Sequence, residues 1–303
     1  MRKHNVAIIV PLYGKLDLTK RMLDSLNESG TDVDNFEATT FFVDNCSPDD
    51  TALWLAQQVP KHGKLVAKLL PTNTGFAGGV NAGLRKALAH EEATGEAFTD
   101  FLVANNDILI PKGTIHQLLT FMDSGPGEIG VVGPMSNMAG GQQCWDRGYG
   151  KGLPDGQSLE DYAAALRHKF VASDWDDRAL PTFVIVGLFF LMSRRFFTDV
   201  GFFDERYYPG MWEESDYCLR GKLAGYKYFI DKSSFVWHEG NATMKEMNLD
   251  VNQTFTRNRT KYVSKWLEGI TEVGKEIVRV NREIGPNDPE LPVRIALQKA
   301  FYR

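Results

Sequence analysis

Blocks of apolar and polar residues alternate along the first hundred residues, and each block has the length of one strand or one helix. Four short, largely apolar runs rich in β-branched and aromatic residues are typical of strands covered on both faces. These runs are residues 6–10, 38–43, 64–70 and 101–104. Between them the apolar residues recur at helical spacing, as in residues 18–26. The pattern predicts an α/β fold with a Rossmann-like wound sheet flanked by helices.

Polar turns rich in small residues follow the ends of all four predicted strands. Because the carboxyl ends of parallel strands meet at one edge of a sheet, we expect these turns to form one site. The wound sheet favours nucleotide binding without requiring it.

The second half of the chain is less regular. We expect helices at residues 114–122, 194–200, 211–225 and 250–284, and strands at 129–134, 183–192 and 226–230. Residues 136–160 are rich in glycine and polar side chains without a clear period, which predicts a loop or lid. Prolines 286, 289 and 292 separate the long helical pattern from a last short helix.

Composition narrows the class of protein. The chain has 303 residues and a net charge of −5, so we expect no nucleic-acid partner. Its three cysteines are widely spaced and favour a reducing compartment. The longest apolar run, residues 183–192, is too short to span a bilayer as a helix, and the start shows no signal-peptide pattern. We therefore expect a cytoplasmic protein.

The polar triplet Asn105, Asn106 and Asp107 interrupts the apolar stretch 100–110. A buried strand does not carry three polar side chains unless the chain leaves the sheet, so we expect a strand end at Ala104 and a turn. An acid at that edge can bind a divalent cation and, through it, a phosphate. A simple turn with local hydrogen bonds is the alternative.

Two further turns could contact a nucleotide. Residues 73–83 form a glycine-rich stretch between a strand and a helix, where backbone amides can approach a ligand. Its spacing matches neither of the common phosphate-binding loops, and a tight helix entry explains it equally well. Asp44 follows a strand and could bind a ribose or base, or form an Asx turn.

An acidic helix start and a lone histidine complete the candidates. Glu213, Glu214 and Asp216 suit the positive end of a helix dipole, or supply a general base. Trp212 before them offers a flat wall of the kind sugars pack on. His238 is structural in the simpler interpretation, or completes a metal site with an acid.

In combination, these stretches resemble the family 2 glycosyltransferases of the GT-A fold, in the branch of rhamnosyltransferase-like and galactofuranosyltransferase-like enzymes. The matching segments appear in the family's order over residues 5–245. They include V-P-L-Y-G at 10–14, V-D-N-C-S-P-D-D-T at 43–51, N-T-G-F-A-G-G-V-N-A-G at 73–83, N-N-D at 105–107, W-E-E-S-D at 212–216 and W-H-E-G-N-A-T at 237–243.

The resemblance implies an inverting, metal-dependent transfer of a sugar from a nucleotide-diphosphate sugar to a hydroxyl of a glycan or lipid-linked glycan. It implies a metal, Mn²⁺ or Mg²⁺, on Asp107 and His238, with Glu214, Glu213 and Asp216 as the catalytic acids and Trp212 at the acceptor. The donor-binding residues it implies are Pro11, Tyr13, Asp44, Phe76, Ala77, Gly78, Asn81, Asn105 and Asn106.

Two departures from the family pattern leave alternatives open. Asn105 replaces the first acid of the metal motif, so that site should be weaker. The base position carries Glu214 where the family usually has Asp, and Glu213 remains a rival. Two other functions stay possible: a nucleotide-sugar-binding protein without transfer, and a sugar nucleotidyltransferase. The family's habits favour a donor of the dTDP-rhamnose or UDP-hexose type and a role in cell-surface polysaccharide synthesis.

The predicted domain covers residues 1–245, with a donor half at 1–107 and an acceptor half at 108–245. A helical extension, residues 246–303, follows. A packed tail is the favoured interpretation of this extension, and homodimerisation or peripheral contact with the inner face of a membrane are the alternatives.

Overall fold

The computed structural model describes residues 3–29, 36–59, 64–125, 129–144, 152–171, 173–240 and 250–280. Its contacts divide the chain into two units, Met1–Asn258 and Arg259–Arg303, and the division falls inside helix α10 (Val251–Val280). The fold described below is that of the first unit. The predicted domain boundary at residue 245 stays a prediction.

The first half of the chain folds as its pattern predicts. Strands and helices alternate from the start to the asparagine-rich turn, and all four predicted strands form. In chain order the elements are β1 (His4–Leu12), α1 (Leu16–Ser29), β2 (Phe36–Asp44), α2 (Thr51–Gln58), β3 (Leu65–Leu69), α3 (Gly75–Thr94) and β4 (Asp100–Ala104). After β4 the chain turns at residues 105–107 and continues as the short strand β5 (Ile108–Leu109), as expected.

The second half adds shorter elements. The helices are α4 (Thr114–Ser124), α5 (Leu159–Val171), α6 (Trp175–Arg178), α7 (Arg194–Val200) and α8 (Glu213–Leu223). The strands are β6 (Ile129–Ser136), β7 (Ala179–Thr182), β8 (Phe189–Ser193) and β9 (Lys227–His238).

Within the described residues, nine strands form one mixed sheet in the order β3-β2-β1-β4-β8-β6-β9-β5, with β7 paired to β9. Strands β3, β2, β1 and β4 are parallel, and β8 runs antiparallel to both β4 and β6. The chain moves outward from β1 to β2 and β3 and then returns to place β4 on the other side of β1. This reversal creates a topological switch point between β1 and β4, where open α/β sheets bind ligands.

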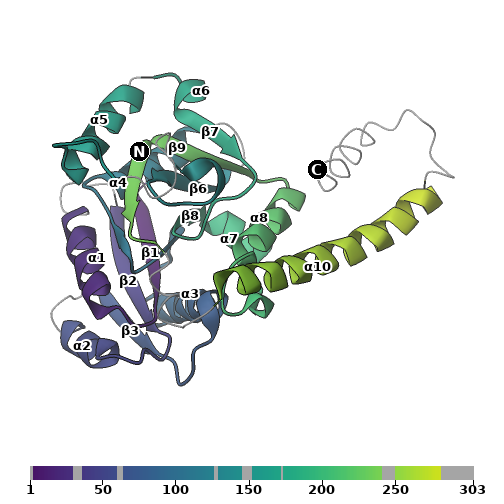
Figure 1. Ribbon diagram of the computed structural model, residues 1–303, viewed down its shortest axis with the longest axis horizontal. Helices are drawn as coiled ribbons and strands as arrows, with labels where there is room; N and C mark the ends of the chain where they lie inside the picture. Colours follow the sequence, from purple (N-terminus) through teal and green to yellow (C-terminus); the bar gives the residue numbers. More distant parts are fainter. Residues whose placement is uncertain are drawn as a thin grey trace. The chain divides into compact units, whose positions relative to one another are not determined.

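Helices cover both faces of the sheet, and β1 shows how the strand residues divide between them. Alternate residues of β1, such as Ile8, pack in a core with α1, α2 and α4. The intervening ones, such as Ile9, pack in a second core with α3, α5, α7 and α8. Figure 1 shows α1 and α2 on one side of the strands and α3 on the other. Burial on both faces explains why these strands are almost continuously apolar.

Two predictions for the second half are wrong. The strand expected at residues 183–192 is only β8, and Phe183 at its predicted start is 76% exposed. The chain leaves the sheet at residues 186–188, where backbone groups bond to Glu214 and Asn105 instead of a strand. Residues 136–160 are not one loop, because β6 extends to Ser136 and a 3-10 turn forms at Gly141–Gln143.

Helix α5 was not predicted: it begins at the end of the segment expected to be irregular, residues 136–160, and continues to Val171. Its residues Tyr162, Ala163 and Leu166 do have helical spacing and are buried in the core. The ring of Tyr162 packs edge-on against that of Phe235 in β9 at 5.0 Å. The helix was not recognised from the sequence because its apolar face is short and follows a long polar stretch.

The C-terminal helical pattern is confirmed as far as the structure describes it, because α10 runs to Val280. The prolines at 286, 289 and 292 and the last short helix lie outside the described residues. Among the described residues, no helix is both long enough and apolar enough to cross a membrane.

Candidate active site

A cleft with a volume of about 240 Å³ opens at the carboxyl edge of the parallel strands. All four turns that follow the parallel strands contribute to it: Tyr13 after β1, Asn45 after β2, Asn73 after β3 and residues 105–107 after β4. The expectation that the polar turns form one site is therefore confirmed. The opposite wall comes from residues 186–188, 209–211, 213 and 214.

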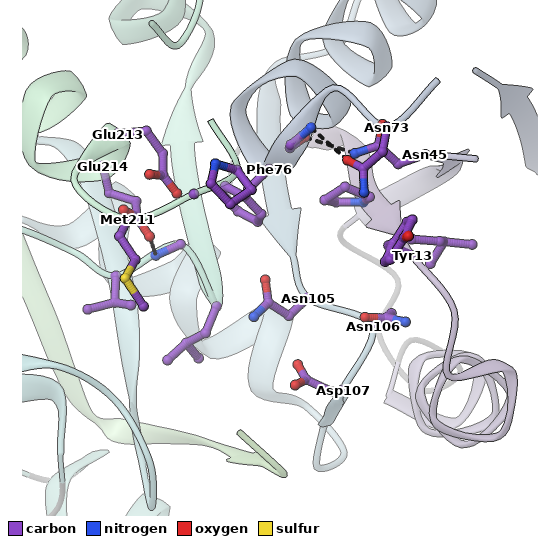
Figure 2. A pocket seen from close by; sticks show the side chains of 18 of the residues that line it. Tyr13, Asn45, Asn73, Phe76, Asn105, Asn106, Asp107, Met211, Glu213 and Glu214 are labelled. Carbon is purple, nitrogen blue, oxygen red and sulfur yellow. Dashed lines mark hydrogen bonds between the residues drawn. The ribbon is translucent and has the colours of Figure 1, made fainter. Parts of the chain in front are cut away.

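The three side chains of the asparagine-rich turn have different roles: one makes a structural hydrogen bond and two lie in the cavity. Asn106 is 3% exposed, and its Nδ2 donates to Thr19 Oγ1 at 2.9 Å, which ties the end of β4 to the start of α1. The Asn105 backbone amide donates to Leu188 O at 3.0 Å, and its side chain projects into the cavity (Figure 2). Asp107 lies beside them in the same cavity.

Asp107 and His238 meet as the sequence predicts. Asp107 Oδ1 lies 3.1 Å from His238 Nε2, because β5 pairs with β9 and sets Ile108 opposite His238. His238 Nδ1 donates to Met138 O at 2.6 Å, which directs Nε2 toward the carboxylate. Burial lowers the pKa of His238, but the hydrogen bond and charge of Asp107 outweigh it and raise the pKa above 6.5.

The donor set suits a cation that a ligand helps to hold. A carboxylate oxygen and an imidazole nitrogen oriented by a backbone carbonyl are common metal ligands. No cluster of three or more His, Cys, Asp or Glu side chains among the described residues could hold an ion by itself. The cleft is lined by three acids and one histidine, with neither lysine nor arginine among its described lining residues. A diphosphate bound here would need added positive charge.

Glu213 and Glu214 line the cleft at the start of α8 (Figure 2). Glu214 Oε1 accepts a hydrogen bond from the Gly187 amide at 3.0 Å. Burial, followed by the charge of Glu214, raises the pKa of Glu213 well above 4.5. Burial also raises the pKa of Glu214, although backbone amides and the Glu213 side chain partly offset it. Burial and the proximity of the two carboxyl groups therefore favour one proton shared by the pair, and Glu214, which accepts the Gly187 amide, is the member placed to act as a carboxylate.

The wall opposite the acids carries Tyr13, Asn45 and Asn73, as Figure 2 shows. Asn45 ties two turns together, because its Oδ1 accepts from Thr74 N at 2.8 Å and its Nδ2 donates to Gly75 O at 2.9 Å. Pro11 and Phe76, two predicted donor contacts, also line the cleft.

The first three amides after Asn73 in the glycine-rich stretch are not available to a ligand. The amides of Thr74, Gly75 and Phe76 donate to Asn45 Oδ1, Asn73 Oδ1 and Pro209 O. The glycines serve close packing instead, since a Cβ on Gly83 would lie 2.3 Å from Ile9. Of the two interpretations left open above, the tight helix entry is the one that the structure supports.

Four of the predicted donor contacts do not line the cleft. Asp44 is 3% exposed within the paired end of β2, and its Oδ1 accepts from the Ser47 amide at 3.1 Å, which is the Asx-turn alternative. Asn81 is 1% exposed and bonds to the backbone of Phe203 and to Glu205. Ala77 and Gly78 are buried in α3, one and two residues beyond the lining residue Phe76.

Two predicted residues on the acidic side also lie outside the cleft. Asp216 is fully buried, accepts from Arg220 Nε at 3.1 Å and from Tyr207 Oη at 3.3 Å, and so joins α8 to its surroundings. The Trp212 ring packs against Phe255 at 5.3 Å. These contacts do not test the acceptor roles expected for Asp216 and Trp212, which stay predictions.

Sequence reasoning missed several lining residues. The sequence does indicate Asn45 as a lining residue, because the residue just after a strand, rather than the last residue in it, faces the edge of the sheet. Gly187 also had a signal, since a glycine interrupts the apolar run there. Pro209, Gly210 and Met211 had no comparable signal, because their place in the cleft depends on contacts made by distant residues.

Residues 7–201 match the family model described as Glycosyl transferase family 2, which is well over half of the chain. The chain belongs to glycosyl transferase family 2. A curated relative, a galactofuranosyl glycosyltransferase from Leishmania donovani, is 46% identical over 56 residues, which cover 18% of this chain and 13% of that protein. This short match agrees with the predicted branch of the family.

Solved structures show the GT-A fold of this family 2 chain. A mannosyltransferase from Pyrobaculum calidifontis, in complex with GDP-Man and Mn²⁺, matches 78% of this chain and 57% of its own with a TM-score of 0.53 and 18% identity. GalNAc-T7 with UDP, GalNAc and Mn²⁺ matches 78% of this chain and 43% of its own, with a TM-score of 0.56 and 12% identity. S. aureus TarS (residues 1–349) matches 87% of this chain and 72% of its own, with a TM-score of 0.52 and 16% identity.

Proposed function

We propose that this family 2 protein transfers a sugar from a nucleotide-diphosphate sugar to a hydroxyl group of a glycan acceptor, with inversion at the anomeric carbon. The observation that carries the proposal is the composition of one cleft at the switch point. It combines a polar wall at Tyr13 and Asn45, a cation-binding corner at Asp107 and His238, and an acid pair across from them, with Glu213 buried and Glu214 half-buried. Related structures hold GDP-Man or UDP together with Mn²⁺.

Each wall has a separate task in the proposed reaction. The turns after β1, β2 and β3 bind the nucleoside, with Tyr13 and Asn45 as the main contacts. Asp107 and His238 bind a divalent cation, Mn²⁺ or Mg²⁺, which offsets the charge of the diphosphate. Asn105, an amide where the metal motif usually has an acid, contributes at most a neutral oxygen.

Glu214 acts as the general base. It accepts the proton of the acceptor hydroxyl while that oxygen bonds to the anomeric carbon and the bond from this carbon to the diphosphate oxygen breaks. A single displacement of this kind inverts the configuration. We assign the carboxylate to Glu214 because its Oε1 accepts the Gly187 amide, which favours the charged form, whereas Glu213 Oε2 has no hydrogen-bond partner within the described residues. Because burial raises the pKa of Glu214, activity should fall on acidification above the range of an ordinary carboxyl group.

Two other functions fit the cleft less well. A binding protein without transfer would not need the two adjacent acids Glu213 and Glu214 in the same cavity as the donor wall. A nucleotidyltransferase would need basic residues for a triphosphate, and the described lining contains neither lysine nor arginine. A donor of the dTDP-rhamnose or UDP-hexose type, a role in cell-surface polysaccharide synthesis and a cytoplasmic location remain part of the proposal.

The test is release of free nucleoside diphosphate from a panel of nucleotide sugars, with mono- and oligosaccharide acceptors, in Mn²⁺, Mg²⁺ or EDTA. We expect one donor to be consumed only with metal and acceptor present. Glu214→Gln should lower kcat about 10²–10⁴-fold while the nucleoside diphosphate still raises the melting temperature. Product analysis by NMR reads the anomeric configuration. Wild-type turnover by Glu214→Gln, or a retained anomer, would overturn the mechanism.

A further inference from the structure

A buried polar side chain next to the cleft comes from α10, outside the segment matched by the family model. Asn258 is fully buried, and its Nδ2 donates to Tyr207 O and Gly210 O, both at 2.7 Å. The carbonyls of Tyr208 and Met211 lie at 3.4 and 3.3 Å from the same nitrogen. One side-chain amide therefore gathers four consecutive or near-consecutive carbonyls of residues 207–211.

Residues 207–212, here called the wall loop, form one side of the cleft. Pro209, Gly210 and Met211 line the cavity, and Glu213 and Glu214 follow directly in the first turn of α8. Pro209 O also accepts the Phe76 amide at 2.7 Å, so the loop meets the start of α3. The position of the acid pair thus depends on the conformation of this loop.

The wall loop holds an unfavourable backbone conformation. Met211 and Trp212 have φ angles of 75° and 78°, in the left-handed region that favours glycine. A residue in this conformation persists only where surrounding contacts impose it. Asn and Asp can offset this conformation because their short polar side chains hydrogen-bond to the nearby backbone. Met and Trp do not have such short polar side chains.

The first turns of α10 supply contacts that can impose this conformation. Besides the four carbonyl contacts of Asn258, Arg257 Nη2 donates to Tyr208 O at 2.8 Å, and the Phe255 ring packs on that of Trp212 at 5.3 Å. Asn258 Oδ1 has no hydrogen-bond partner within the described residues. The Asn258 side chain therefore acts through its Nδ2 donor, which faces the loop.

We propose that Asn258 is a positioning residue for sugar transfer: its amide holds the wall loop in the strained conformation that places Glu213 and Glu214 in the cleft. The catalytic consequence rests on the proposed function above, whereas the effect on the loop does not. Asn258 acts through the loop and does not contact the reacting atoms. It makes the start of α10 part of the active-site architecture, although the family model ends at residue 201.

Two substitutions separate positioning from simple support of the helix. Asn258→Ala removes the donor and favours helix, because alanine has the higher helix propensity, so α10 itself should persist. Asn258→Asp keeps the shape but replaces the donor with a charge that repels the four carbonyls. Asn252→Ala is the matched control, an exposed asparagine of the same helix that lies outside the cleft.

The experiment combines hydrogen–deuterium exchange with steady-state kinetics on the full-length chain. In both Asn258 variants we expect peptides covering residues 207–213 and Phe76 to exchange about ten-fold faster, with β1 and β4 unchanged. We expect kcat to fall about ten-fold or more while the donor KM changes less than about three-fold. Asn252→Ala should behave as wild type in both measurements.

Three results would overturn the inference: unchanged exchange of the wall loop, faster exchange spread equally through β1 and β4, or faster loop exchange with wild-type kcat. A wild-type protein that consumes no nucleotide sugar would instead refute the proposed function. In that case the exchange data alone would still decide whether Asn258 holds the loop.

Discussion

The two ends of strand β4 carry the same residue types with opposite consequences. At its amino end, Asp100 is buried against His4, whose Nδ1 lies 2.7 Å from Asp100 Oδ2 and whose Nε2 lies 3.0 Å from Asp123 Oδ2. Just beyond its carboxyl end, Asp107 lies 3.1 Å from His238 Nε2 at the wall of an open cleft.

The difference lies in what remains available to a ligand. Both nitrogens of His4 are occupied by carboxylates, and Thr99 Oγ1 also donates to Asp100 Oδ2, so this cluster is closed and structural. At the other end, His238 uses Nδ1 on a backbone carbonyl and turns Nε2 and the Asp107 carboxylate toward the cavity. A histidine–acid pair is therefore a candidate site only where the cavity can complete its coordination.

The largest effect that tests this comparison should come from Asp107→Asn. Loss of the cation-binding charge should lower kcat/KM about 10²–10³-fold with little change in melting temperature, because Asp107 lies at the cavity wall. Asp100→Asn is the matched control at the closed end and should show the reverse, normal turnover per folded molecule and a lower melting temperature. Steady-state kinetics and thermal unfolding of both variants test this comparison. Equal turnover by the two variants would contradict the distinction between the open and the closed histidine–acid pair.

The second prediction concerns His4→Gln. Removing the cation leaves two facing carboxylates, one of them fully buried, and should lower the free energy of unfolding by about 3 kcal/mol. Urea unfolding measures this change. Turnover of the folded fraction should stay at the wild-type level, and a selective loss of turnover would mean that the closed cluster also serves the active site.

The third prediction is a smaller kinetic effect of His238→Gln. Because Asp107 would remain to bind the cation, we expect a decrease of about 10–100-fold in activity at fixed metal, partly restored at high Mn²⁺ concentration. A titration of activity against Mn²⁺ reads this directly. Indifference to metal concentration would argue that His238 only orients Asp107.

The smallest effect should be the pH dependence of stability. The hydrogen bond to Asp100 raises the pKa of His4 above 6.5, against the opposing effect of burial. The stabilisation is therefore fully present below pH 6.5 and is lost as the pH rises through the raised pKa. The melting temperature of the wild type should decline over that window, and His4→Gln should flatten the decline. An equal slope in both proteins would contradict the assignment.

The strand ends could be read from the sequence because local pattern decides them. The apolar run that stops at Ala104, the polar triplet after it and the lone His238 at the end of a long strand all mark strand ends. The alternation of strands and helices predicts that the turns after the parallel strands meet at one edge of the sheet, whereas Asp107 and His238 meet through the antiparallel pairing of β5 with β9. The same reasoning could not find the closed cluster, because His4 and Asp123 are far apart in the sequence and come together only in the folded chain.

The sequence alone was enough for the α/β class, the four parallel strands, the edge at which the cleft lies and the family. These depend on periodicity and on the ordered motifs, which are local properties of the chain. Only the tertiary structure decided which polar side chains face the cavity: Asn45 rather than Asp44, Glu213 and Glu214 rather than Asp216, and a wall loop held by Asn258. Those choices depend on side-chain direction and on contacts between distant residues, which no local pattern records.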